Sequence, residues 1–122
     1  QILLRTLVRF EQLGNRAFAG AVHGMLIGCA AALEDWDAAQ VHLARAEEEL
    51  EVTGQSWQDV ALLTQDAGKR ALEAGKLDLA QAVLTLSLKH WEELDSLEEA
   101  QQVRDELLHL QQMTDSQADH HQ

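Results

Sequence analysis

Residues 17 to 33 read AFAGAVHGMLIGCAAAL, and His23 is the only strongly polar side chain among them. Glycine occurs at every fourth position here, at Gly20, Gly24 and Gly28. Glycine inside a helix costs up to about 1 kcal/mol relative to alanine. Because residues four apart share one helical face, we infer that a second helix approaches this face with its backbone almost in contact. The large side chains share another stripe: Phe18, Val22, Met25, Leu26 and Leu33. The stretch therefore predicts a helix at the centre of the fold.

A membrane-spanning segment is the main alternative for this stretch, because small residues four apart promote association of transmembrane helices. The apolar run is, however, slightly shorter than the ~20 residues that a span needs. It also lacks a cluster of Arg and Lys, or of Trp and Tyr, at its start. We therefore expect a buried helix and no membrane partner.

The overall composition favours an all-helical protein. The chain has 122 residues and no proline, and 46% of its residues are hydrophobic. Its formal net charge of −12 opposes binding to nucleic acid or to an anionic membrane, which both require Lys and Arg patches. Cys29 is the only cysteine, so no disulfide can form within the chain and a reducing, cytoplasmic location is expected. Because the chain begins at Gln1 and is already apolar at Ile2, we expect it to be part of a longer protein.

Apolar stripes separated by Gly and Asp-Ser breaks predict about six helices, over residues 1–13, 15–34, 37–52, 56–74, 77–94 and 97–112. One helical domain is expected over residues 1–113. Its parts are the end of a preceding repeat at 1–13, hairpins at 15–52 and 55–94, and a capping helix at 96–113. The polar residues 114–122 are predicted to be a disordered tail.

Segments of the chain recur at offsets of forty and forty-one residues. WDAA at 36–39 corresponds to LDLA at 77–80, and Leu43 corresponds to Leu84. A second type of turn occurs three times: FEQLGN at 10–15, LEVTGQ at 50–55 and WEELDS at 91–96. The predicted helices thus form a repeated helix–turn–helix unit.

This unit resembles the tetratricopeptide repeat (TPR) family. The family has a small residue in the first helix, a Gly or acidic turn, and an Ala followed by a large apolar residue in the second helix. Gly68, Gly75, Lys76, Ala80 and Leu84 match that pattern. The second-helix side of the other hairpin also matches, at Asp35, Ala39, Leu43 and Ala46. The resemblance implies an all-α, right-handed solenoid of antiparallel helix hairpins.

The sequence also departs from the family. Ala30 and Ala71 stand where an aromatic residue is expected, and the closing proline is absent. The period is about forty residues rather than the usual thirty-four. Longer, degenerate repeats of this kind resemble those of large bacterial regulators.

The resemblance implies a protein–protein interaction module within a larger bacterial signalling or regulatory protein. No enzymatic activity, cofactor or metal is expected. The partner would be a protein or peptide bound in a groove lined by the first helix of each hairpin. The predicted groove residues are Ala21, Gly24, Gly28, Ala31, Leu62, Gln65, Lys69, Leu72, Glu73 and Glu106.

Two other functions remain open. Glu106 and His109 form a Glu-x-x-His sequence, which is half of the carboxylate di-iron signature of metal-binding helical bundles. That site requires a second copy, and no other histidine has a glutamate three residues before it. The other alternative is a domain that serves only for oligomerisation.

The N-terminal segment has apolar residues around much of its predicted helix, at Leu3, Leu4, Leu7 and Val8. An exposed patch of several large apolar side chains usually marks an interface. We therefore expect residues 1–13 to mediate self-association, most simply as a homodimer.

Overall fold

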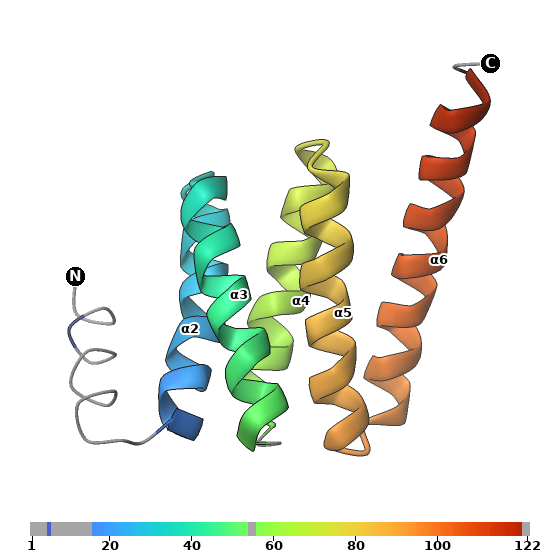
Figure 1. Ribbon diagram of the computed structural model, residues 1–122. Helices are drawn as coiled ribbons and strands as arrows, with labels where there is room; N and C mark the ends of the chain where they lie inside the picture. Colours follow the sequence, from blue (N-terminus) through green and yellow to red (C-terminus); the bar gives the residue numbers. More distant parts are fainter. Residues whose placement is uncertain (1–4, 6–15, 54–55, 121–122) are drawn as a thin grey trace.

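The computed structural model describes Arg5, residues 16–53 and residues 56–120 (Figure 1). These residues form five helices and no strand, which confirms the all-α prediction. The helices are α2 (Arg16–Ala32), α3 (Trp36–Thr53), α4 (Gln58–Glu73), α5 (Leu77–Glu93) and α6 (Leu97–His120). In this part of the chain, no helix is long and apolar enough to cross a membrane. The helix predicted at 1–13, with its interface residues Leu3, Leu4, Leu7 and Val8, lies outside the described residues.

The turns after α2, α4 and α5 share one backbone geometry. Glu34, Gly75 and Asp95 have φ angles of 57°, 77° and 55°. In each turn the next N–H donates to the carbonyl oxygen five residues earlier: Asp35 to Ala30 at 2.8 Å, Lys76 to Ala71 at 2.9 Å and Ser96 to Trp91 at 3.0 Å. This is the left-handed ending that commonly stops a helix. The turn between α5 and α6 therefore has the same geometry as the turns within the two hairpins, although the sequence comparison did not group them.

A buried alanine follows the start of each of the helices α3 to α6. Its N–H donates to the carbonyl oxygen four residues earlier, which is the first helical hydrogen bond at that end. The four residues are Ala39, Ala61, Ala80 and Ala100. A methyl side chain at this position allows neighbouring helices to approach closely where the chain reverses direction.

The helices form two hairpins, α2–α3 and α4–α5, which stand side by side with α6 at the outer edge (Figure 1). The hairpins meet mainly through α2 and α4, whereas α3 has little contact with α5. The last helix packs principally on α5. The contact between the two hairpins and the contact of the second hairpin with α6 are therefore made by different pairs of helices.

Helix α5 packs between apolar neighbours on two sides. Leu79 and Leu86 lie in a core cluster to which all five described helices contribute. Leu84 and Trp91 lie in a second cluster, with apolar residues of α4 and α6. Because both clusters include α5, this helix joins the first hairpin to α6.

The glycine stripe of α2 packs closely against side chains of two other helices, whereas its spacing predicted one helix with its backbone almost in contact. A Cβ atom added at Gly24 would lie 2.5 Å from Val60 Cγ1 on α4. One added at Gly20 would lie 2.7 Å from Glu49 Cβ on α3. Only residues without a Cβ allow approaches this close.

Two leucines at helix ends are exposed: Leu33, which the sequence places on the stripe of large side chains, and Leu97. Leu33 is 79% exposed because α2 ends at Ala32, so Leu33 belongs to the turn and no longer follows the helical stripe. Leu97 is 74% exposed at the first position of α6. A residue on a helical stripe is buried only where a neighbouring helix packs over it. Leu33 and Leu97 lie at helix ends, beyond that packing.

The C-terminal segment also differs from the prediction, since α6 continues to His120 rather than ending near residue 112. Thr114 Oγ1 donates to the Leu110 carbonyl oxygen at 3.0 Å, and Gln111 Nε2 donates to Asp115 Oδ1 at 3.1 Å. No Gly or Pro interrupts residues 97–120, so helical propensity carries the helix well past the buried Leu110.

Candidate functional site

The exposed side of α4 lies between α2 and α6 and brings together several of the predicted groove residues. Its opposite side is buried against α5, which leaves the remaining stripe to solvent. On that stripe Leu62 is 50% exposed and Leu63 is 38% exposed. Lys69 and Glu73 are exposed further along the same helix. We call this surface the α4 face.

A polar network joins the α4 face to α5 and α6. Trp91 Nε1 donates to Gln65 Oε1 at 3.2 Å, and Gln65 Nε2 donates to Glu106 Oε1 at 3.4 Å. Lys69 Nζ lies 3.4 Å from the same Glu106 oxygen. The structure thus brings three predicted groove residues, Gln65, Lys69 and Glu106, into direct contact.

The network also shows which of these groups holds the others in place. Gln65 is buried, and both ends of its amide are used, so it positions Glu106 rather than offering a free group. Glu106 Oε2 is buried and has no hydrogen-bond partner in the part of the chain that the structure describes. Such an oxygen is uncommon in a folded protein, because desolvation without a partner is unfavourable.

Gly24 and Gly28 are used for helix packing. Val60 occupies the space beside Gly24, and Leu63 Cβ would lie 3.3 Å from a Cβ added at Gly28. Both glycines are predicted groove residues, and in the structure side chains of α4 lie in the space beside them. Leu72 is likewise partly buried against the main core rather than open to the groove.

Two hollows border the contact between α2 and α4. The larger, of about 480 Å³, is lined by Ala31, Ala32, Leu33, Glu34, Trp36, Arg70, Glu73 and Ala74. The smaller, of about 350 Å³, is lined by Ala21, Met25, Trp57, Gln58, Asp59 and Val60. The predicted groove residues Ala21, Ala31 and Glu73 therefore line these hollows. The groove prediction missed four lining residues, Met25, Trp36, Trp57 and Asp59. Both tryptophans and Asp59 lie at or next to the start of a helix, whereas Met25 lies within α2.

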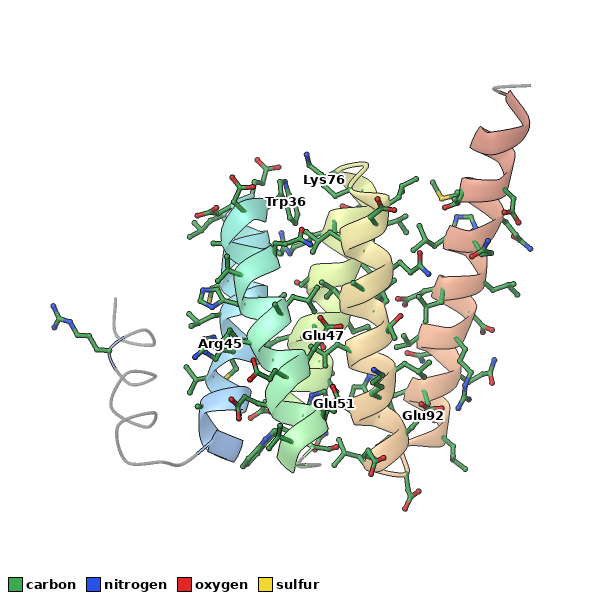
Figure 2. The ribbon with its side chains drawn as sticks, in the orientation of Figure 1. Trp36, Arg45, Glu47, Glu51, Lys76 and Glu92 are labelled. Atoms are coloured by element: carbon green, nitrogen blue, oxygen red, sulfur yellow. The ribbon has the colours of Figure 1, made fainter. Side chains whose placement is uncertain are left out.

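A third hollow, of about 370 Å³, lies on the other side of the stack between α3 and α5. It is lined by Glu47, Leu50, Glu51, Leu86 and Lys89. Figure 2 shows Glu47 and Glu51 directed from α3 toward the space beside α5. Both glutamates are exposed to solvent, and Lys89 of α5 lines the same hollow.

Two histidines meet between α2 and α3. His23 Nδ1 lies 3.1 Å from His42 Nδ1, and the ring centroids are 5.3 Å apart. Burial lowers the pKa of His42, and the nearby Asp35 carboxylate partly opposes this shift. His23 is buried. The pair therefore contributes to the hairpin interior rather than to the α4 face.

The Glu-x-x-His sequence does not converge with further metal ligands in the described residues. Glu106 contacts Gln65 and Lys69, while His109 is exposed. Among the residues that the structure describes, no three His, Cys, Asp or Glu side chains are placed to hold one metal ion.

The comparisons with known proteins transfer no site residues to this chain. No family model matches it, and neither a curated protein nor a solved structure matches it significantly. The α4 face, its polar network and the two hollows beside it are the features from which a function can be argued.

Proposed function

We propose that this chain is a protein–protein interaction module that binds a partner protein or peptide along the α4 face. One observation carries the proposal. Leu62 and Leu63 are exposed between two hollows that border the same pair of helices. Concave sites that combine apolar walls with a few polar groups are typical binding sites. The proposed role is binding rather than catalysis.

The chemistry of the α4 face suits a polypeptide partner. Leu62 offers apolar contact area, while Lys69 and Glu73 offer charges of both signs. Polypeptides present apolar side chains and charged groups within a few residues of one another. The net charge of −12 disfavours nucleic acid, whose phosphates require a basic surface.

We further propose that the hairpins are TPR-like repeats of a larger bacterial regulatory protein that acts in the cytoplasm. The equivalent turns at Glu34 and Gly75 are forty-one residues apart, which supports a repeating unit. The single cysteine suits a reducing compartment. A repeat array would extend the α4 face into a longer binding surface.

A random peptide library displayed on phage and selected on the immobilised chain tests the proposal. Peptides that bind the parent chain should bind Leu62→Asp at least about tenfold more weakly, because a carboxylate replaces exposed apolar area at the centre of the face. Val41→Asp is the matched control, since Val41 is 62% exposed on α3.

The proposal fails if no peptide is enriched, or if selected peptides bind Leu62→Asp as tightly as the parent. A chain that selects no peptide but self-associates would instead be an oligomerisation domain. A melting temperature of Leu62→Asp close to that of Val41→Asp would show that lost binding does not reflect lost folding.

A further inference from the structure

The two hollows of the α4 face lie on one side of the contact between α2 and α4. These helices run parallel, because Gly24 meets Val60 and Gly28 meets Leu63. The hollow residues Ala21, Met25 and Ala32 occupy one stripe of α2 at helical spacing. Asp59, Arg70 and Glu73 occupy one stripe of α4. The smaller hollow lies at the start of α4, and the larger lies at its end.

The distance between the hollows follows from helix geometry. On α2, the lining residues of the smaller hollow are about nine positions from those of the larger hollow. On α4 the separation is fourteen positions, from Asp59 to Glu73. At 1.5 Å per residue these separations are roughly 14 Å and 21 Å. An extended peptide rises about 3.3 Å per residue, so roughly four to six of its residues span this distance.

Each hollow combines an aromatic ring with a carboxylate. The smaller contains Trp57 and Asp59, and Asp59 forms no ion pair with the described residues. The larger contains Trp36, which lies near the turn end of the stack in Figure 2, together with Glu34 and Glu73. This pairing favours a cationic side chain, which can lie over a ring while its charge meets the carboxylate.

Arg70 is the one cationic side chain among the residues that line the two hollows, and its charge is already paired with a carboxylate of the protein. Its Nε lies 2.9 Å from Asp66 Oδ2, so the guanidinium is oriented along α4. Glu73 adds to the acidic field around it. The larger hollow also has two carboxylates, Glu34 and Glu73, and Glu34 forms no ion pair with the described residues.

We propose that these hollows hold an extended basic peptide segment in which two Arg or Lys side chains, four to six residues apart, each enter one hollow. This inference rests on the proposed function and specifies the partner's charge and the spacing of its anchors. The net charge of −12 complements such a segment and accelerates its association.

Fluorescein-labelled peptides of Ser and Ala with two arginines provide the test, measured by fluorescence anisotropy with the whole chain. Arginines five positions apart should bind about tenfold more tightly than arginines two or ten positions apart, because only the first spacing fills both hollows. Asp59→Asn and Glu73→Gln should each weaken that peptide several-fold and remove the spacing preference. Glu51→Gln removes the same charge from the hollow between α3 and α5 and should change neither result.

Equal affinity at all three spacings would overturn the inference, because it would show general charge attraction. Equal weakening by Glu51→Gln, or a preference for peptides with glutamate in place of arginine, would also overturn it. If none of these peptides binds, the inference is wrong. The proposed function then still stands, provided that library peptides bind and that Leu62→Asp weakens them.

Discussion

Gly24 and Gly28 belong to one stripe of α2 but tolerate different changes. The atom nearest to an added Cβ at Gly24 is Val60 Cγ1 at 2.5 Å, and Val60 is fully buried. A β-branched side chain in a helix has little freedom to rotate away. At Gly28 the nearest atom is Leu63 Cβ at 3.3 Å, and Leu63 is partly exposed.

We therefore predict opposite effects for the two alanine variants. Gly24→Ala should lower the free energy of unfolding by ~1–3 kcal/mol, because it overpacks the contact between α2 and α4. Gly28→Ala should be neutral or stabilising by up to about 1 kcal/mol, because helix propensity then outweighs a small displacement of Leu63. Urea unfolding followed by circular dichroism measures both. A Gly24→Ala variant as stable as Gly28→Ala would contradict the close contact.

His90 of α5 is a second position where one side chain has a defined role. It is buried, and its Nδ1 accepts the backbone N–H of Trp57 at 3.1 Å, so the proton of the neutral ring lies on Nε2. Burial lowers its pKa from 6.5 to about 4. Protonation of Nδ1 would break this bond between α5 and the residue that precedes α4.

We predict that His90 makes the protein less stable as the pH falls. Between pH 6.5 and about 4 the unfolded chain binds a proton at this histidine and the folded protein does not. Its contribution is therefore complete above pH 6.5 and declines through that window. His90→Asn keeps an acceptor but does not titrate, so its free energy of unfolding should fall less over the same range. Parallel slopes in urea unfolding experiments would contradict this role.

At the scale of the element, α6 shows how one helix can be anchored by a few residues. Leu110 is buried in the main core cluster, and Val103 is buried in the second. Leu108 lies on the same helix and is 59% exposed. The remainder of α6 is largely polar, so its attachment to α5 depends on one apolar stripe.

We predict that Leu110→Ala lowers the free energy of unfolding by ~2–5 kcal/mol, because it leaves a cavity in a core to which all five described helices contribute. Leu108→Ala removes the same atoms from an exposed position and should change stability by less than about 0.5 kcal/mol. Chemical unfolding of the two variants gives the comparison directly. Similar losses would mean that α6 is packed in another register.

At the scale of the whole molecule, two hairpins and α6 form a stack whose steps are not identical. α2 meets α4 in the first step, and α6 meets α5 in the second. The α4 face exists because α4 is covered by α5 on one side only, while its two neighbours border it. The arrangement of helices, rather than any single one, therefore creates the candidate binding surface.

Self-association is the prediction that belongs to this scale. The apolar residues of segment 1–13, which lies outside the described residues except for Arg5, predict a homodimer. Leu4→Glu combined with Leu7→Glu should convert the dimer to a monomer, because two charges would be buried at the interface. Light scattering gives the mass of each form. A monomer mass for the unmodified chain at high concentration would contradict the prediction.

The sequence by itself determined the five helices of the described residues and the need for a close contact at the glycine stripe. These features depend on local periodicity and on backbone preferences within a few residues. Glu34 and Asp95 show the limit of such reasoning, since neither is glycine and both nevertheless adopt a positive φ. Residues 114–120 show it too, because polar composition predicted disorder where α6 continues.

Only the tertiary structure decided which helix fills the space beside each glycine and which groove residues meet. Trp91 and Gln65 are 26 positions apart, and Gln65 and Glu106 are 41 apart, yet hydrogen bonds join them. The hollows beside α4 likewise need α2 of one hairpin and α4 of the next to lie side by side. Such contacts depend on how distant segments pack, and no local pattern encodes that distance.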